Sequence, residues 1–106
     1  MSDGLTVQGE IWTLRGARDV VHTVIVLDSV PHLVRGGLVA VALVIPAREA
    51  PNARALLTVP IPGTKDAVAV FRLGTFSATR FLEKVGMLDR DTLENVRMAL
   101  RARFDL

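Results

Sequence analysis

Residues 20–27 read Val-Val-His-Thr-Val-Ile-Val-Leu, and residues 38–45 read Leu-Val-Ala-Val-Ala-Leu-Val-Ile. β-Branched side chains dominate the first run, and they fit a pleated sheet and are poor helix formers. The second run is apolar throughout, which is typical of a strand buried on both faces. Pro31 follows the first run and Pro46 closes the second. The two runs therefore predict two strands, the second of them inside a sheet.

Shorter segments on either side also have strand character. Their ranges are 10–14, 56–59, 68–73 and, as a short sixth strand, 75–77. A turn over Arg15–Asp19 separates the first two strands, and a charged loop over Ala47–Arg54 follows the third. The spacing predicts five or six short strands.

The last third of the chain changes to a helical period. Asp89 is suited to cap a helix, because its carboxylate can accept from free backbone N–H groups in the first turn. The apolar positions 93, 96, 100 and 104 are then three or four residues apart and form one stripe. Residues 78–85 predict a shorter helix that ends at Gly86. The order of elements predicts an α+β fold, mainly β, as a half-open barrel or strongly bent sheet with helices on one side.

The composition of the chain excludes several kinds of functional site. The chain has 106 residues, half of them apolar, which suffices for one domain with a real core. It has no cysteine, which excludes disulfides, a thiolate nucleophile and cysteine-ligated metal sites. With only two histidines a multi-histidine metal centre is not expected. The net charge of +2 permits an anionic partner without requiring one.

The first residues show neither a basic patch nor an apolar core of a secretory signal. The longest apolar run, Leu38–Ile45, is far shorter than the ~20 residues of a membrane-spanning helix. We expect a cytoplasmic protein without a membrane partner, with residues 1–8 as a flexible N-terminal segment and residues 9–106 as a single domain.

An ordered set of short motifs from residue 9 to residue 106 resembles a known family. It comprises Gly9-Glu10-Ile11-Trp12, the hydrophobic strand Val24–Leu27, the strand ending Val44-Ile45-Pro46, and the tail from Arg80 to Asp89 followed by Thr92-Leu93, Val96 and Ala99-Leu100. The set is similar to the MazF/PemK-type toxins of type II toxin–antitoxin systems, which are sequence-selective endoribonucleases.

The resemblance implies a small SH3-like (plectin-type) barrel of five to six strands with a C-terminal helix packed on it. It further implies a homodimer that cuts single-stranded RNA without a metal or other cofactor and leaves a 2′,3′-cyclic phosphate and a 5′-OH. The partner it implies is an acidic antitoxin whose tail lies across the RNA groove.

Two positions depart from the family's pattern. The family carries an Arg-Pro pair at the start of the second strand, where this chain has His22-Thr23, and a Thr or Ser after the third strand, where this chain has Arg48. An imidazole can act as base or acid near neutral pH, and a guanidinium can clamp a phosphate. His22 and Arg48 are therefore the predicted catalytic pair.

The predicted RNA-binding residues are basic or polar side chains of loops and strand ends. Two flank Gly16 in the first turn, one lies in a later loop, and two fall where the family's last strands face the groove: Arg15, Arg18, Lys65, Arg72 and Thr75. Trp12 could stack on a base, but core packing is the more ordinary role for a tryptophan in a strand.

Other interpretations stay open. A histidine inside a β-branched run is often a partly buried structural residue. The two substitutions also allow a catalytically silent or retargeted toxin that acts by binding, for example a CcdB-like gyrase inhibitor. A third alternative is a plain binding module whose groove receives only a partner peptide.

Overall fold

The computed structural model describes residues 7–27 and 38–104. Its strands are β1 (Glu10–Arg15), β2 (Val21–Val26), β3 (Leu38–Pro46), β4 (Thr58–Pro60), β5 (Asp66–Ser77) and β6 (Phe81–Met87), followed by the helix α1 (Arg90–Phe104). They form one six-stranded sheet in the order β4-β5-β3-β2-β1-β6, and every pairing is antiparallel. The prediction of a mainly β, α+β fold with a C-terminal helix is confirmed.

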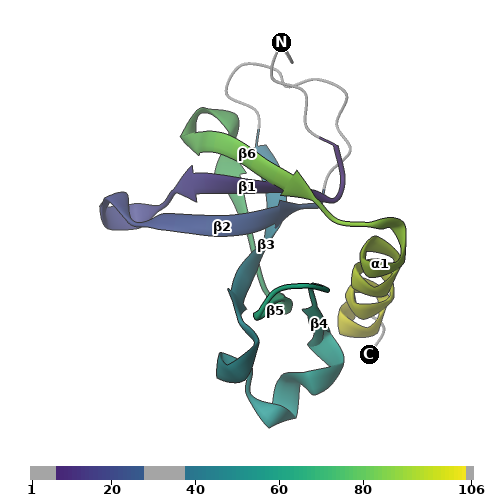
Figure 1. The fold of residues 1–106 in the computed structure, drawn as a ribbon. Helices are drawn as coiled ribbons and strands as arrows, with labels where there is room; N and C mark the ends of the chain where they lie inside the picture. Colours follow the sequence, from purple (N-terminus) through teal and green to yellow (C-terminus); the bar gives the residue numbers. More distant parts are fainter. Residues whose placement is uncertain (1–6, 28–37, 105–106) are drawn as a thin grey trace.

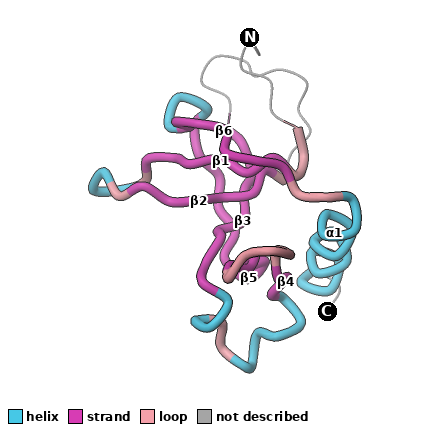
Figure 2. The backbone as a smooth tube through the Cα atoms, viewed as in Figure 1, coloured by secondary structure: helices cyan, strands magenta, loops and turns pink. Residues whose placement is uncertain are grey.

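Short helical turns connect the strands (Figure 2). They are η1 (Ala17–Asp19), η2 (Ala47–Glu49), η3 (Asn52–Leu57) and η4 (Ala78–Arg80). β4 and β6 are the two edges of the described sheet, so the barrel is half-open.

A large bulge in β5 bends the sheet. Ala42 of β3 pairs with Leu73, whereas the next residue, Leu43, pairs with Ala69, so Val70, Phe71 and Arg72 of β5 have no counterpart on β3. Extra residues on one strand increase its local twist and bend. Figure 1 shows the consequence: β1, β2 and β6 run across the molecule, while β4 and the adjoining ends of β3 and β5 run in a clearly different direction.

The bent sheet has an apolar cluster on each face, because neighbouring side chains of a strand point to opposite faces. The helix-side cluster consists of Ile25, Ala42, Val59, Val68, Val70, Leu88, Val96 and Ala99. The turn-side cluster consists of Leu14, Val24, Val26, Val39 and Val41. β3 contributes to both, as its unbroken apolar sequence predicts. Each fully buried Val, Leu or Ile contributes about 1.5–3 kcal/mol of transfer free energy.

The helix begins as the sequence predicts. The Asp89 carboxylate accepts a hydrogen bond of 2.7 Å from the backbone N–H of Thr92. Hydrogen bonds from the Thr92 side chain and backbone lower the pKa of Asp89. The predicted apolar stripe is wrong at its end, because Phe104 is 71% exposed. The buried positions of α1 are Thr92, Val96 and Ala99, so the inner face is turned by about one residue from the predicted stripe.

The predicted helix over residues 78–85 is wrong. Only the turn η4 is helical there, and the following residues form β6, which pairs with β1 from Glu10↔Met87 to Leu14↔Phe81. Pairing with the free edge of β1 outweighs the local helix preference of this segment. The two strands predicted over 68–73 and 75–77 are one continuous strand, β5. The predicted strand over 56–59 is shorter and shifted, as β4.

Residues 1–6 of the predicted flexible segment lie outside the described residues. Gln8 is anchored: its amide donates to the Leu27 carbonyl at 3.0 Å, and its carbonyl accepts from the Arg97 guanidinium at 2.7 and 3.0 Å. In the part of the chain that the structure describes, no helix is long and apolar enough to cross a membrane.

Candidate functional site

A pocket of about 440 Å³ opens beside the turn-side cluster of the bent sheet and extends to the end of α1. Four strands and the helix line it, with Leu14, His22, Val24, Val41, Leu43, Phe71, Arg72, Leu73, Gly74, Phe76 and Arg103. The floor is apolar, and one imidazole and two guanidinium groups supply the polar part. These described lining residues include no Asp or Glu, so the pocket favours an anionic ligand.

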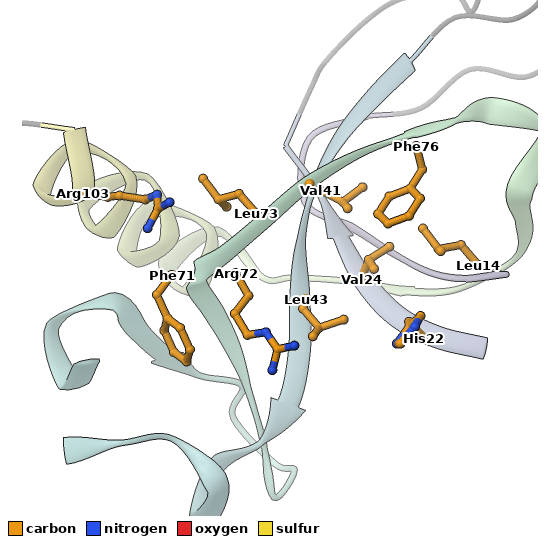
Figure 3. Close-up of a pocket in the computed structure, with 11 residues that line it drawn as sticks. Leu14, His22, Val24, Val41, Leu43, Phe71, Arg72, Leu73, Phe76 and Arg103 are labelled. Carbon is orange, nitrogen blue, oxygen red and sulfur yellow. The ribbon is translucent and has the colours of Figure 1, made fainter. Parts of the chain in front are cut away.

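His22 lies at one end of the pocket (Figure 3). It sits near the start of β2, opposite Leu14 of β1, and it is partly buried. It points to the same face as Val24, two residues on. A methyl group at Gly16 would stand 2.7 Å from His22 Cδ2 and 3.0 Å from Nε2, so the imidazole packs closely against the backbone of Gly16.

The β1–β2 turn next to His22 is hydrogen-bonded to Arg80 of η4, the short turn that precedes β6. The Arg80 guanidinium donates to the carbonyls of Arg15 and Gly16 at 3.1 and 3.4 Å. Within the turn, Arg18 and Asp19 have φ values of 59° and 60°, in the left-handed region that non-glycine residues rarely adopt. The turn therefore has a defined shape, and His22 rests against it.

Arg15 and Arg18, both predicted to bind RNA, belong to this turn and do not line the pocket. The Arg15 side chain forms an ion pair of 3.7 Å with Asp19, and Arg18 is exposed. Both cations lie on the rim next to the His22 end of the pocket, since Arg15 pairs with Val21 in the β1–β2 ladder.

Arg72 enters the pocket from the β5 bulge. Figure 3 shows Arg72 and His22 on either side of Leu43. Phe71, its neighbour in the bulge, has the Arg54 guanidinium 5.9 Å from its ring centre, so a further cation from η3 lies beside this part of the pocket. The structure thus brings the predicted catalytic His22 and the predicted RNA-binding Arg72 into one pocket.

The other predicted residues lie elsewhere. Arg48 is exposed on η2, and the backbone N–H of Ala47 beside it donates to the Lys65 carbonyl at 2.8 Å, so Arg48 and Lys65 lie at the same end of the sheet. Thr75 is exposed on β5, opposite Ala40. None of the three lines the pocket.

Arg103 lines the pocket, and sequence reasoning did not select it. Positions 96, 99 and 103 share one face of a helix, so an arginine at 103 continues the inner stripe marked by Val96 and Ala99. A cation in line with the apolar positions Val96 and Ala99 was the signal that could have identified it.

Trp12 has a structural role. Its ring meets Phe81 edge-on at 5.6 Å, and its indole N–H donates to Glu10 Oε1 at 2.9 Å. Glu10, only 7% exposed, also forms an ion pair of 3.1 Å with Lys84. Burial alone would raise the pKa of Glu10, but the hydrogen bonds from Trp12, Lys84 and the backbone of Val7 outweigh it and hold that pKa below its usual value. This network joins β1 to β6 and stands apart from the pocket.

The pocket combines the groups that act on phosphodiesters. An imidazole exchanges protons near neutral pH, and a guanidinium offsets charge on a phosphate. Among the described residues no three His, Asp or Glu side chains cluster as metal ligands.

Comparisons with known proteins address the fold. No family model matches the sequence, and no curated protein matches it. Solved structures do match. MazF from Deinococcus radiodurans has a TM-score of 0.77 at 16% identity, with 96% of this chain and 98% of that chain covered. The Mycobacterium tuberculosis toxin MazF-mt6 has a TM-score of 0.74 at 19% identity, with 92% and 97% covered.

A third match is an endoribonuclease in complex with its cognate antitoxin, from a mycobacterial species. Its TM-score is 0.76 at 12% identity, and it covers 95% of this chain and 96% of that chain. Each match extends over nearly the whole of both chains, strands and helix included. The chain has the fold of the MazF-type toxins.

Proposed function

We propose that this protein is an endoribonuclease toxin that cleaves single-stranded RNA in the pocket between His22 and Arg72, with sequence selectivity and without a metal ion. The observation that carries the proposal is the joint presence of an imidazole and a guanidinium in one acid-free pocket of a MazF-type fold.

The chemistry follows from RNA itself. Removal of the 2′-OH proton lets the 2′-oxygen attack the adjacent phosphorus, and the bond to the 5′-oxygen of the next nucleotide breaks once that oxygen gains a proton. The products are a 2′,3′-cyclic phosphate and a 5′-OH. In this proposal His22 exchanges a proton with one of these oxygens, and Arg72 stabilises the negative charge on the phosphorane.

The remaining predicted residues act on the strand outside the pocket. Arg15 and Arg18 on the β1–β2 turn, Lys65 in the turn before β5 and Thr75 near the end of β5 would contact phosphates or sugars of flanking nucleotides. Arg48 stays a predicted second catalytic group. Arg48 does not line the pocket, and its exposed position on η2 at the end of β3 supports contact with a bound strand outside it.

We further propose that the protein works as a homodimer in the cytoplasm and is neutralised by an acidic antitoxin. The free sheet edge β6 carries the exposed apolar side chains Leu82, Val85 and Met87, which supports association. The antitoxin bound to the similar mycobacterial endoribonuclease, together with the cationic lining of this pocket, supports an acidic tail that folds as it binds.

The test uses purified protein and an unstructured single-stranded RNA in the presence of EDTA. Cleavage with 5′-OH ends, which accept label from a polynucleotide kinase without prior phosphatase treatment, is the expected result. His22→Ala is the matched variant. Intact RNA with the wild-type protein, or equal cleavage by both proteins, contradicts the proposal.

The alternative of a CcdB-like gyrase inhibitor is less well supported, because the similar structures reported above are an endoribonuclease and two MazF proteins. A supercoiling assay separates the two functions. Gyrase activity unchanged by the protein, alongside RNA cleavage, is the result expected here.

A further inference from the structure

The side chain of Arg103 has a polar atom without a partner. Its Nε is buried, and it is the single buried side-chain nitrogen or oxygen within residues 7–27 and 38–104 that has no hydrogen-bond partner. A buried donor without an acceptor is costly. Burial closes Nε to a ligand as well as to solvent, but the terminal Nη groups of Arg103 are not among the buried atoms without a partner, and the side chain lines the pocket. A ligand of the pocket would therefore meet Arg103 through its Nη groups.

The surroundings of Arg103 indicate the chemistry of that ligand. The described lining of the pocket contains no carboxylate, and it contains a second guanidinium, that of Arg72. The Phe104 ring centre lies 5.6 Å from the Arg103 guanidinium carbon, within the range of a cation–π contact. A guanidinium whose two Nη groups are accessible can bind a phosphate end-on through two parallel hydrogen bonds.

The position of Arg103 separates it from the predicted chemistry. Figure 3 shows Arg103 reaching in from α1, next to Leu73, whereas His22 lies at the other end of the pocket, beyond Arg72 and Leu43. A phosphate held by Arg103 is therefore not the one acted on beside His22. A polynucleotide offers a second phosphate on the same strand.

We propose that Arg103 binds a phosphate that flanks the cleaved bond and so anchors the RNA strand at the α1 end of the pocket. This inference rests on the proposed function for its ligand. It assigns the last turn of the C-terminal helix to substrate binding, a role that neither the motifs nor the strand pattern suggested.

The test measures binding in the absence of cleavage. The probe is a short fluorescent single strand of mixed sequence with 2′-O-methyl ribose, which keeps every phosphate and lacks the nucleophile. Its affinity is measured over a series of salt concentrations for the wild-type protein, Arg103→Gln, Arg103→Lys and the control Arg101→Gln. Arg101 is exposed on the same helix and does not line the pocket.

Arg103→Gln is expected to weaken binding about tenfold. It is also expected to reduce the slope of log K against log salt by about 0.7, the value for one phosphate contact on a single strand. Arg103→Lys keeps the charge and loses the paired donors, so it retains the slope and binds more weakly than the wild type. Arg101→Gln is expected to change affinity by less than about twofold and to leave the slope near the wild-type value.

An unchanged slope in Arg103→Gln, or an equal loss in Arg101→Gln, overturns the inference. If Arg103→Gln does not fold by circular dichroism, Arg103→Lys decides, and wild-type affinity in that variant overturns the inference as well. The outcome is separable from the proposed function. If the wild-type protein leaves RNA intact but Arg103→Gln reduces the salt slope, the proposed nuclease function is wrong and the phosphate site at Arg103 is supported. If the wild-type protein cleaves RNA but Arg103→Gln binds the probe as the wild type does, the nuclease function is supported and the phosphate site is wrong.

Discussion

The imidazole of His22 rests on Gly16: a methyl group built at Gly16 would come within 2.7 Å of His22 Cδ2. Gly16 has φ −91°, which any residue can adopt. Its missing side chain therefore serves the close approach of the imidazole and not an unusual backbone. The first turn of the sheet sets the position of the ring at the end of the pocket.

Gly16→Ala is expected to displace the His22 ring while the fold is retained. A displaced catalytic group costs about tenfold to a hundredfold in rate, and the change in unfolding free energy is expected to stay below about 1 kcal/mol because the ring can rotate away. RNA cleavage and thermal unfolding check this. Gly86→Ala is the matched control, because its methyl group would meet Ile11 at an ordinary 3.5 Å. Equal activities of the two variants would show that the contact does not position His22.

His22→Ala is expected to lower the cleavage rate by about 10²- to 10⁴-fold, the usual contribution of a positioned acid or base. His22 is only partly buried, so the variant is expected to remain folded. Single-turnover cleavage with saturating protein separates this chemical effect from weaker RNA binding. A variant that cleaves as fast as the wild type would reduce His22 to a structural residue.

Glu10→Gln is expected to lower the unfolding free energy by about 1–2 kcal/mol, because the charge-assisted contact to Lys84 is lost. The lowered pKa of Glu10 means that this stabilisation is complete above the pKa of the unfolded carboxyl and is lost as the pH falls through the folded value. Wild-type stability therefore drops more steeply in acid than that of the variant. Denaturant unfolding of both proteins at several pH values measures this difference. Equal pH dependence of the unfolding free energy in the wild type and Glu10→Gln would contradict a stabilising role of the ionised Glu10 carboxylate.

The protein is expected to behave as a dimer at micromolar concentration, with twice the chain mass by light scattering. Val85→Lys places a charge on the β6 edge and is expected to shift the mass toward the monomer. Leu56→Lys, on the 87% exposed Leu56 of η3, is the control and leaves the dimer intact. A monomeric wild-type protein would contradict the dimer, and dissociation by Leu56→Lys alone would move the interface away from β6.

The strands β2 and β3 and the helix α1 could be predicted because each depends on local chemistry. The β-branched runs become β2 and β3, and Asp89 caps α1 as its carboxylate predicts. The segment now in β6 could not, because its conformation depends on the free edge of β1, which is distant in sequence. Local preference alone favoured a helix there.

The same distinction applies to the pocket. His22 was selected for its chemistry at a position taken from the family resemblance, and Arg72 because it falls where that family's last strands face the groove; the pocket contains both. Arg103 was not selected, since its approach depends on how α1 packs against β4 and β5. Small rotations of a helix decide which of several neighbouring arginines turns inward, and no local pattern encodes that rotation beyond the spacing from Val96.

The stretch Val70–Arg72 contributes Phe71 and Arg72 to the pocket and takes no part in the pairing of β3 with β5. These residues have no partners on β3, so Phe71 and Arg72 are exchangeable without rewriting the hydrogen-bonded ladder on either side. Substitutions at Phe71 and Arg72 can therefore change which ligand the pocket accepts while the paired strands on either side of the bulge stay as they are.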